Sequence, residues 1–268
     1  MMSSDFKFSN KYLSYFGMMI CEFDGGADSI TIGSQISFNT TKSANSDKLL
    51  TLNTEYSEPL STSFQIAKID DTNSVIPLTM EEIRAITLWL QTADVRELRF
   101  CDNKYGFDEI IYTGSFDRVS RINKNGMIVG LEVSFLSNLP YGLTEEQVIE
   151  IDALKNSDFS LINDNDMNGY FVPRLVEITL KEAGDFVLYN KNTKIETVIT
   201  GCIANEVISI DQELQWLSTN YQQHDIHDCF NYNFIKIFRR DESNENSFFT
   251  SLNCTLKVYC SYARKVGI

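Results

Sequence analysis

Strict alternation of apolar and polar side chains is the feature of this sequence that most constrains its fold. Near the C-terminal end, apolar residues occupy every second position from Leu252 to Tyr262, and polar residues such as Asn253 lie between them. Successive side chains of a strand point to opposite faces, so this pattern predicts a strand with one buried and one solvated face. A second long alternation runs from Met127 to Phe135. We therefore expect a mainly β protein.

Shorter segments repeat this pattern between turn-forming residues. Alternating apolar residues predict a strand over residues 29–38. Two polar stretches interrupt the pattern, residues 39–61 and the segment around residues 143–168, and the first is expected to be an extended hairpin or a mobile loop. The other expected strands are Phe64–Ile69, Glu97–Cys101, Asp108–Tyr112, Ser115–Ser120, Val176–Lys181, Phe186–Tyr189, Ile195–Thr200, Glu206–Ile210 and Tyr232–Phe238.

One helix is clearly signalled. Thr79 and Glu82 have the spacing of a capping box, in which each side chain satisfies a backbone N–H left unpaired at the helix start. The helix is expected to run from Thr79 to about Gln91. Its apolar residues recur at helical spacing and should pack on a sheet. They are Met80, Ile83, Ile86, Trp89 and Leu90.

The run Asn138–Gly142 contains a proline and a glycine directly after a long predicted strand. Both residue types interrupt regular structure, so this run predicts a domain boundary near residue 141. The 268 residues then form two mostly antiparallel β domains, residues 1–141, which carry the helix at 79–91, and residues 142–268. No internal repeat relates the two domains.

The charge of the chain argues against several classes of partner. Asp and Glu total 37 against 23 Lys and Arg, which gives a formal charge of −14 at pH 7. This charge opposes binding to a phosphate backbone or to anionic lipid, so we expect neither nonspecific nucleic-acid binding nor membrane binding. The apolar run Met18–Ile20 is too short for a signal peptide. The chain is therefore expected to be made and kept in a cytoplasm.

Six cysteines are scattered along the chain without any C-x-x-C spacing. Zinc ribbons and redox pairs both use that spacing, so we expect buried free thiols instead. The cysteines are Cys21, Cys101, Cys202, Cys229, Cys254 and Cys260.

The two histidines lie close together, next to a cysteine. His224, His227 and Cys229 are residue types that bind zinc. Their spacing matches no i, i+4 pair on a helix, and no second half-site is evident elsewhere in the sequence. This pattern favours a polar loop over a metal centre.

A second run resembles the first half of a calcium-binding loop. Asp164, Asp166 and Asn168 place oxygen ligands at alternate positions, and Gly169 follows. The position that should close the cage with a bidentate carboxylate is Leu175. An ordinary turn before a strand has the same composition, so we expect a turn and no resident metal or cofactor.

No motif for nucleophilic, acid–base or phosphate chemistry occurs in the sequence. With only two histidines, the supply of general bases is small. Acidic pairs such as Glu81–Glu82 and Glu145–Glu146 lie at a helix start and in a linker, where charges are usually solvated. The residues therefore favour a binding or assembly role over an enzyme.

A series of features follows a recognisable order along nearly the whole chain. In the N-terminal half these are Met18–Phe23, Ser29–Phe38, the helix with the Trp89–Leu90 pair, Leu98–Phe100, Tyr105–Phe107 and the strand ending in Phe135–Tyr141. In the C-terminal half they are Asn168–Gly169, Pro173, Ile208–Asp211 and Tyr262–Gly267. In this order they resemble the distal tail protein family of siphophages that infect Gram-positive bacteria, the hub between tail tube and tail tip.

The resemblance implies an N-terminal β-sandwich with one α-helix and a projecting hairpin that builds a hexameric ring, followed by a galectin-like β-sandwich. Such a ring would connect the tail tube to the tail tip or baseplate and leave an acidic or neutral channel for DNA. Residues 39–61 are the candidate ring hairpin. Its candidate interface residues are Thr41, Lys42, Lys48, Leu49, Leu50, Thr51 and Leu52.

The resemblance also implies partners and a location. The chain would contact copies of itself, the tail tube protein, the tape measure protein, the tail-associated lysin or tip protein, and receptor-binding proteins. It would be assembled in the host bacterial cytoplasm and reside in the virion, at the phage tail tip.

A carbohydrate-binding lectin or adhesin module is the alternative, because it shares the β-sandwich. Galectins use an H-x-N-P-R strand and a tryptophan in a W-G-x-E context. Here Trp216 is followed by Leu217 and Ser218, and neither histidine begins the required run. For Trp216 and Tyr221, simple packing is therefore favoured over sugar stacking.

Overall fold

Antiparallel strands make up most of the structure, which is mainly β as the alternation predicts. The computed structural model describes residues 4–23, 36–42, 48–56, 58–70, 72, 74–101, 109–240 and 243–265. Most of the strand expected over residues 29–38, and the aromatic turn at 105–107, lie outside these residues.

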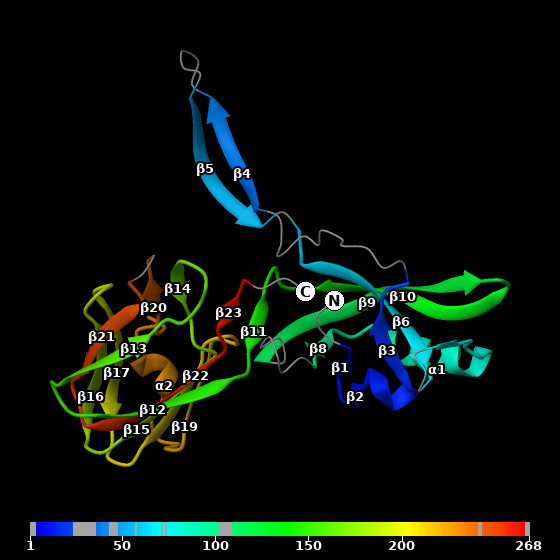
Figure 1. Ribbon diagram of the computed structural model, residues 1–268. Coiled ribbons are helices and arrows are strands. Elements are labelled where there is room, and N and C mark those ends of the chain that lie inside the picture. Colours follow the sequence, from blue (N-terminus) through cyan, green and yellow to red (C-terminus); the bar gives the residue numbers. More distant parts are fainter. Residues whose placement is uncertain are drawn as a thin grey trace. The chain divides into compact units, whose positions relative to one another are not determined.

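The chain divides into two compact units (Figure 1). Unit 1 comprises Met1–Leu143 together with Arg264–Ile268, and unit 2 comprises Thr144–Ala263. Sequence reasoning assigned all of residues 142–268 to the second domain. The last residues group with unit 1 because Arg264 belongs to a short strand whose partner is the strand at Gly142–Thr144.

Unit 1 is built on one antiparallel sheet with the strand order β2-β1-β8-β9-β10-β6-β3. The short strands β7, β11 and β23 are attached to this path. The bounds are β1 (Phe6–Phe8), β2 (Lys11–Tyr12), β3 (Met18–Cys21), β6 (Ser61–Ile69), β7 (Val75–Ile76), β8 (Arg96–Phe100), β9 (Ile110–Lys124), β10 (Met127–Ser137), β11 (Gly142–Thr144) and β23 (Ala263–Arg264).

The sheet's longest strands, β9 and β10, form a hairpin around Asn125 and Gly126, both with positive φ. The two strands expected over Asp108–Tyr112 and Ser115–Ser120 are one continuous strand, β9, and Gly114 lies between them. Strand β10 passes so close to Gly114 that only a residue without a side chain fits there. A Cβ at this position would lie 2.2 Å from the Leu136 carbonyl oxygen.

The single long helix, α1 (Met80–Leu90), begins with the predicted capping box. Thr79 Oγ1 accepts from the Glu82 N–H at 3.2 Å, and Glu82 Oε2 accepts from the Thr79 N–H at 2.8 Å. Met80, expected in the buried stripe, is 59% exposed. At 100° per residue it lies at the edge of the stripe formed by the other four apolar residues.

Aromatic rings fill the core beneath α1. The Trp89 ring stacks on Phe6 at 5.5 Å and on Phe16 at 4.8 Å, and its indole N–H donates to the Phe8 carbonyl at 3.3 Å. Phe16 belongs to the 3-10 helix η1 (Leu13–Phe16). The helix thus packs on the sheet, as expected.

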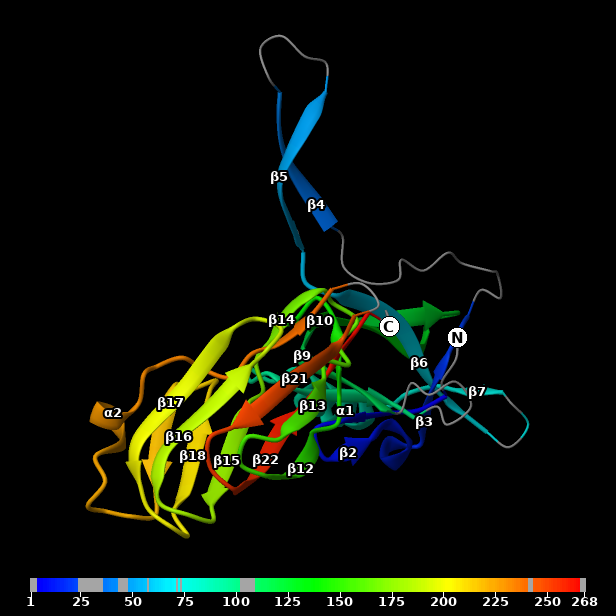
Figure 2. The same cartoon turned by 90° about the vertical axis from the view of Figure 1, so that its left-hand side faces the viewer.

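Unit 2 is a β-sandwich (Figure 2). One sheet has the order β12-β22-β15-β18-β19 and the other β13-β21-β16-β17, and residues of both sheets, such as Ile178 and Phe248, share one core. Their bounds are β12 (Gln147–Ala153), β13 (Asp158–Ile162), β15 (Leu175–Leu180), β16 (Gly184–Asn190), β17 (Ile195–Cys202), β18 (Val207–Asp211), β19 (Trp216–Thr219), β21 (Glu245–Thr250) and β22 (Cys254–Cys260).

Unit 2 also corrects three sequence expectations. The polar stretch around residues 143–168 contains β12 and β13, which the polar side chains of their exposed faces conceal in the sequence. The strand expected over Tyr232–Phe238 is confined to β20 (Ile237–Arg239), which pairs with β14 (Gly169–Phe171). The loop expected around the histidines contains a helical turn, α2 (Ile226–Cys229).

Candidate functional site

The candidate ring hairpin consists of β4 (Ile36–Lys42) and β5 (Leu49–Tyr56), which pair only with each other among the described residues (Figure 1). All seven candidate interface residues are exposed. Thr41, Lys42, Leu49, Leu50, Thr51 and Leu52 lie in these two strands, and Lys48 directly precedes β5. A side-chain bond from Asn39 Nδ2 to Glu55 Oε1, at 2.8 Å, links the two strands.

The exposed side chains of the hairpin are unusually apolar. Leu52 is 71% exposed and Leu49 59%. The alternation predicted a buried face for Ile36 and Phe38, yet these are 45% and 64% exposed. Their strand belongs to a two-stranded sheet with no second layer described over it. A two-stranded sheet is marginally stable by itself, and clustered exposed apolar side chains typically mark contact surfaces.

The potential metal ligands His224, His227 and Cys229 do not come together as one site. Among the described residues, the potential ligand atoms that lie within 4.8 Å of one another belong to Cys202, Glu206 and His224, all buried. His227 is exposed on α2, with its ring 5.8 Å from that of Trp216. Sequence reasoning missed Glu206, because its partner is 18 residues away in the chain.

Hydrogen bonds account for this buried group. His224 Nδ1 lies 2.7 Å from Glu206 Oε1, and its Nε2 lies 2.8 Å from the Thr200 carbonyl oxygen. A carbonyl oxygen only accepts hydrogen bonds, so the His224 ring donates from Nε2 to Thr200. Both imidazole nitrogens are engaged with oxygen atoms of the chain, so neither is free to bind a metal ion.

Three hydrogen bonds support the Glu206 carboxylate. Burial acts to raise the pKa of this group, but bonds from Thr219 Oγ1, His224 and the Ile203 N–H outweigh that effect, so its pKa lies below the ordinary value. Burial also raises the pKa of the nearby Cys202 thiol to about 12. A protonated thiol is a poor metal ligand.

The loop that resembles a calcium site alternates between exposed and buried residues. Asp164, Asp166 and Asn168 are exposed, whereas Asn163, just before them, and Asn165, between the two aspartates, are buried. Asn165 Oδ1 accepts from the Ala263 N–H at 2.6 Å, and Asn163 Nδ2 donates to the Ile237 carbonyl at 2.9 Å. The turn is thus held by two buried amides, which sequence reasoning did not single out.

The expectation of buried thiols holds for three of the six cysteines. Cys202, Cys254 and Cys260 are buried, whereas Cys21, Cys101 and Cys229 are half-buried. Burial raises the pKa of both Cys254 and Cys260 to about 11. These thiols are therefore protonated and unreactive at neutral pH.

Two domain models of phage tail proteins match this chain. The model described as a phage tail protein N-terminal domain covers residues 1–138, and that of a phage tail C-terminal domain covers residues 141–260. The chain belongs to this family of phage tail proteins. No curated protein sequence matches the tail protein.

Solved structures share the fold of this tail protein. The crystal structure of the Dit protein (gp 19.1) of phage SPP1, described as a paradigm of the hub adsorption apparatus in phages infecting Gram-positive bacteria, matches with a TM-score of 0.68. At 10% identity, the match covers 96% of this chain and 98% of that one. The fold implied by the resemblance to distal tail proteins is therefore confirmed.

Baseplate structures of phage P2 in the activated conformation, with Ca and with Sr, match with TM-scores of 0.47 and 0.44. Both are 9% identical; the matches cover 99% and 96% of this chain and 100% and 97% of the others. Within the described part of the tail protein, no helix is both long and apolar enough to span a membrane.

Proposed function

We propose that this tail protein is a distal tail hub, six copies of which close into a ring between the tail tube and the tail tip or baseplate. Membership of a phage tail family supports a structural role in the virion. The likeness in fold to SPP1 Dit, which is described as a hub protein, supports this particular place in the tail.

The β4–β5 hairpin is the structural feature that best supports the formation of a ring. Its leucines and Phe38 are large apolar side chains that the rest of the described chain leaves exposed. In a head-to-tail ring each subunit offers one surface and accepts a different one, so a hairpin of this kind is suited to lie against a neighbouring copy. Burial of these side chains would stabilise both the hairpin and the ring.

The ring would enclose a channel for the passing genome. An acidic or neutral lining serves this purpose, because a basic lining would bind DNA by releasing its counterions. We further propose the tail tube, tape measure, tail-associated lysin or tip, and receptor-binding proteins as partners, with assembly in the host cytoplasm. The role requires no catalysis, and we expect none.

Mass photometry and negative-stain imaging of the purified protein test the ring. We expect six-subunit particles with a central hole. Changing Leu50 and Leu52 together to Asp places two charges in the proposed interface and should shift the particles to monomers. Leu214→Asp is the matched control, since Leu214 is 76% exposed in unit 2 and lies outside the proposed interface.

Two results would contradict the proposal. The first is that the variant with Asp at positions 50 and 52 forms rings as abundantly as the unmodified protein does. The other is a wild-type protein that stays monomeric both alone and when mixed with tails that lack it.

A further inference from the structure

Strand β12 forms one edge of the five-stranded sheet of unit 2 and pairs with β22 alone. All seven of its residues have a partner on β22, from Gln147 opposite Cys260 to Ala153 opposite Cys254, without a bulge. Alternate residues of such a strand direct their N–H and C=O groups away from the partner. Among the described residues, no backbone group binds these outward groups. The outer edge of β12 can therefore accept another strand.

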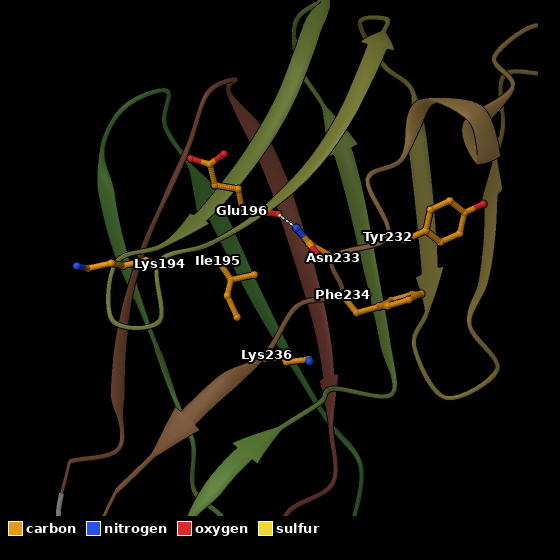
Figure 3. A pocket seen from close by; sticks show the side chains of 7 residues that line it. All are labelled: Lys194, Ile195, Glu196, Tyr232, Asn233, Phe234 and Lys236. Atoms are coloured by element: carbon orange, nitrogen blue, oxygen red, sulfur yellow. Dashed lines mark hydrogen bonds between the residues drawn. The ribbon is translucent and has the colours of Figure 1, made fainter.

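A different edge of unit 2, at β17, is protected. The Val198 N–H donates to Asn231 Oδ1 at 3.1 Å, and the Asn231 N–H donates to the Val198 carbonyl at 3.1 Å. The Asn233 side chain donates to the Glu196 carbonyl at 3.1 Å (Figure 3). By contrast, β12 has neither such a cover nor the lysine, proline or bulge with which many edge strands avoid pairing. It is also longer than the remaining edge strands, β13 and β19.

The two faces of β12 differ in chemistry. Ile149 and Ile151 pack against the core of the sandwich but are only half-buried. Val148, Glu150 and Asp152 alternate with them on the opposite face and are exposed. A strand added at this edge would place apolar side chains beside the isoleucines and would meet two carboxylates on its other face. A segment in which apolar and basic residues alternate fits both faces, because opposite charges on neighbouring strands attract.

The charge of the edge also argues against a second copy of this chain as the occupant. Residues 145–154 include four acidic residues and no lysine or arginine. Antiparallel pairing of two β12 strands, centred on Glu150 or Ile151, would place Glu150 opposite Glu150 or Asp152 of the other copy. Like charges directly opposite each other destabilise a strand pair. The lysines that contact these carboxylates, Lys257 and Lys181, come from β22 and the end of β15, on the paired side of β12.

We propose that the outer edge of β12 binds an extended segment of another protein in which apolar and basic residues alternate. The segment adds a strand to the sheet, so that backbone hydrogen bonds supply affinity and the side chains supply specificity. Its apolar side chains cover Ile149 and Ile151, and its lysines or arginines pair with Glu150 and Asp152. The site belongs to unit 2 alone and goes beyond the proposed ring, which uses the hairpin of unit 1.

Synthetic peptides as long as β12 test the proposal on the full-length protein. One alternates lysine and valine, a second alternates glutamate and valine, and a third has the composition of the first with its lysines and valines in separate blocks. Fluorescence anisotropy of the labelled peptides measures binding, and hydrogen–deuterium exchange locates it. We expect the first peptide to bind about tenfold more tightly than the other two and to slow amide exchange within residues 147–153.

A charge reversal places the binding on β12. Glu150→Lys should weaken the binding of the lysine–valine peptide about tenfold and strengthen that of the glutamate–valine peptide. The Glu150 side chain is 61% exposed, so the fold should survive this change. Glu213→Lys is the matched control, because it makes the same change of charge at an exposed residue between β18 and β19, and it should leave binding unchanged.

The proposal is overturned if no peptide slows exchange within residues 147–153 at about 1 mM, or if the block peptide binds as tightly as the alternating one. Equal effects of Glu150→Lys and Glu213→Lys would also overturn it. Exchange in β12 that slows as the protein concentration rises, without peptide, would assign the edge to a second copy instead. The variant with Asp at positions 50 and 52 should bind the peptide normally, which separates this test from that of the ring.

Discussion

His224 Nδ1 and Glu206 Oε1 lie 2.7 Å apart in the interior of the second unit. The two side chains are 5% and 0% exposed. The pair joins the turn before β18 to the segment that follows β19, and Thr219 binds the same carboxylate oxygen at 2.6 Å. Removing one partner of such a buried pair strongly destabilises the folded protein. Without His224, the Glu206 carboxylate would be buried without its imidazole partner.

Replacing His224 by Ala should therefore lower the free energy of unfolding by about 3–5 kcal/mol. Urea denaturation followed by circular dichroism measures this change. His227→Ala is the matched control, since that histidine is exposed, and it should stay within about 0.5 kcal/mol of the unmodified protein. If both changes lowered the free energy of unfolding equally, the buried pair would contribute no more to stability than an exposed histidine does.

Because of the same pair, we expect the stability of the folded protein to depend on pH. The folded pKa of Glu206 lies below its ordinary value, so its stabilising effect is complete above pH 4.5 and is lost as the pH falls through the folded pKa. Thermal unfolding of Glu206→Gln should show a smaller loss of Tm between neutral pH and pH 3 than the unmodified protein shows. Parallel Tm curves for the two proteins would contradict this assignment.

The capping box of α1 makes a separate prediction. Thr79→Ala removes the acceptor for the Glu82 N–H and should cost about 1 kcal/mol. A bond from Lys68, together with the Thr79 bonds, lowers the pKa of Glu82 to about 2. Its stabilisation is thus complete above pH 4.5 and lost toward pH 2. Glu82→Gln should lower Tm at pH 7, whereas Glu81→Gln, one residue earlier on the exposed first turn, should change it little.

Substitution of Gly114 tests how closely β9 and β10 approach each other. In Gly114→Ala the new Cβ would meet the Leu136 carbonyl oxygen at 2.2 Å, so the strands must separate and stability should fall by more than about 2 kcal/mol. Gly126→Asn at the open hairpin turn should cost less than about 1 kcal/mol, because nothing lies near its Cβ and Asn tolerates positive φ. Chemical denaturation of both variants gives the comparison.

Salt should strengthen the proposed ring. Six copies at −14 each carry a charge of −84, and their mutual repulsion weakens as ions screen it. The proportion of rings measured by sedimentation velocity should therefore rise between low and physiological ionic strength. A fall would mean that ion pairs, and not apolar contacts of the hairpin, close the ring.

Local patterns in the sequence determined much of this protein. Alternation alone predicted the mainly β fold and strands such as β10 and β22, because the period of two depends only on neighbouring residues. The capping box at Thr79 predicted the start of α1 for the same reason. The polar stretch that became the exposed hairpin was also visible in the sequence, together with its leucines.

Only the tertiary structure decided features that depend on distant partners. Gly114 lies inside a continuous strand, where β9 and β10 are very close, and does not end the strand. β12 is a strand because β22 pairs with it. Glu206 and His224 form a buried pair only because the sandwich brings together two segments 18 residues apart. Tyr232, with a φ of +57°, lies between Asn231 and Asn233, whose side-chain amides donate to the Glu196 carbonyl of β17. In each case the stabilising contact is long-range, so no local pattern of residues could encode it.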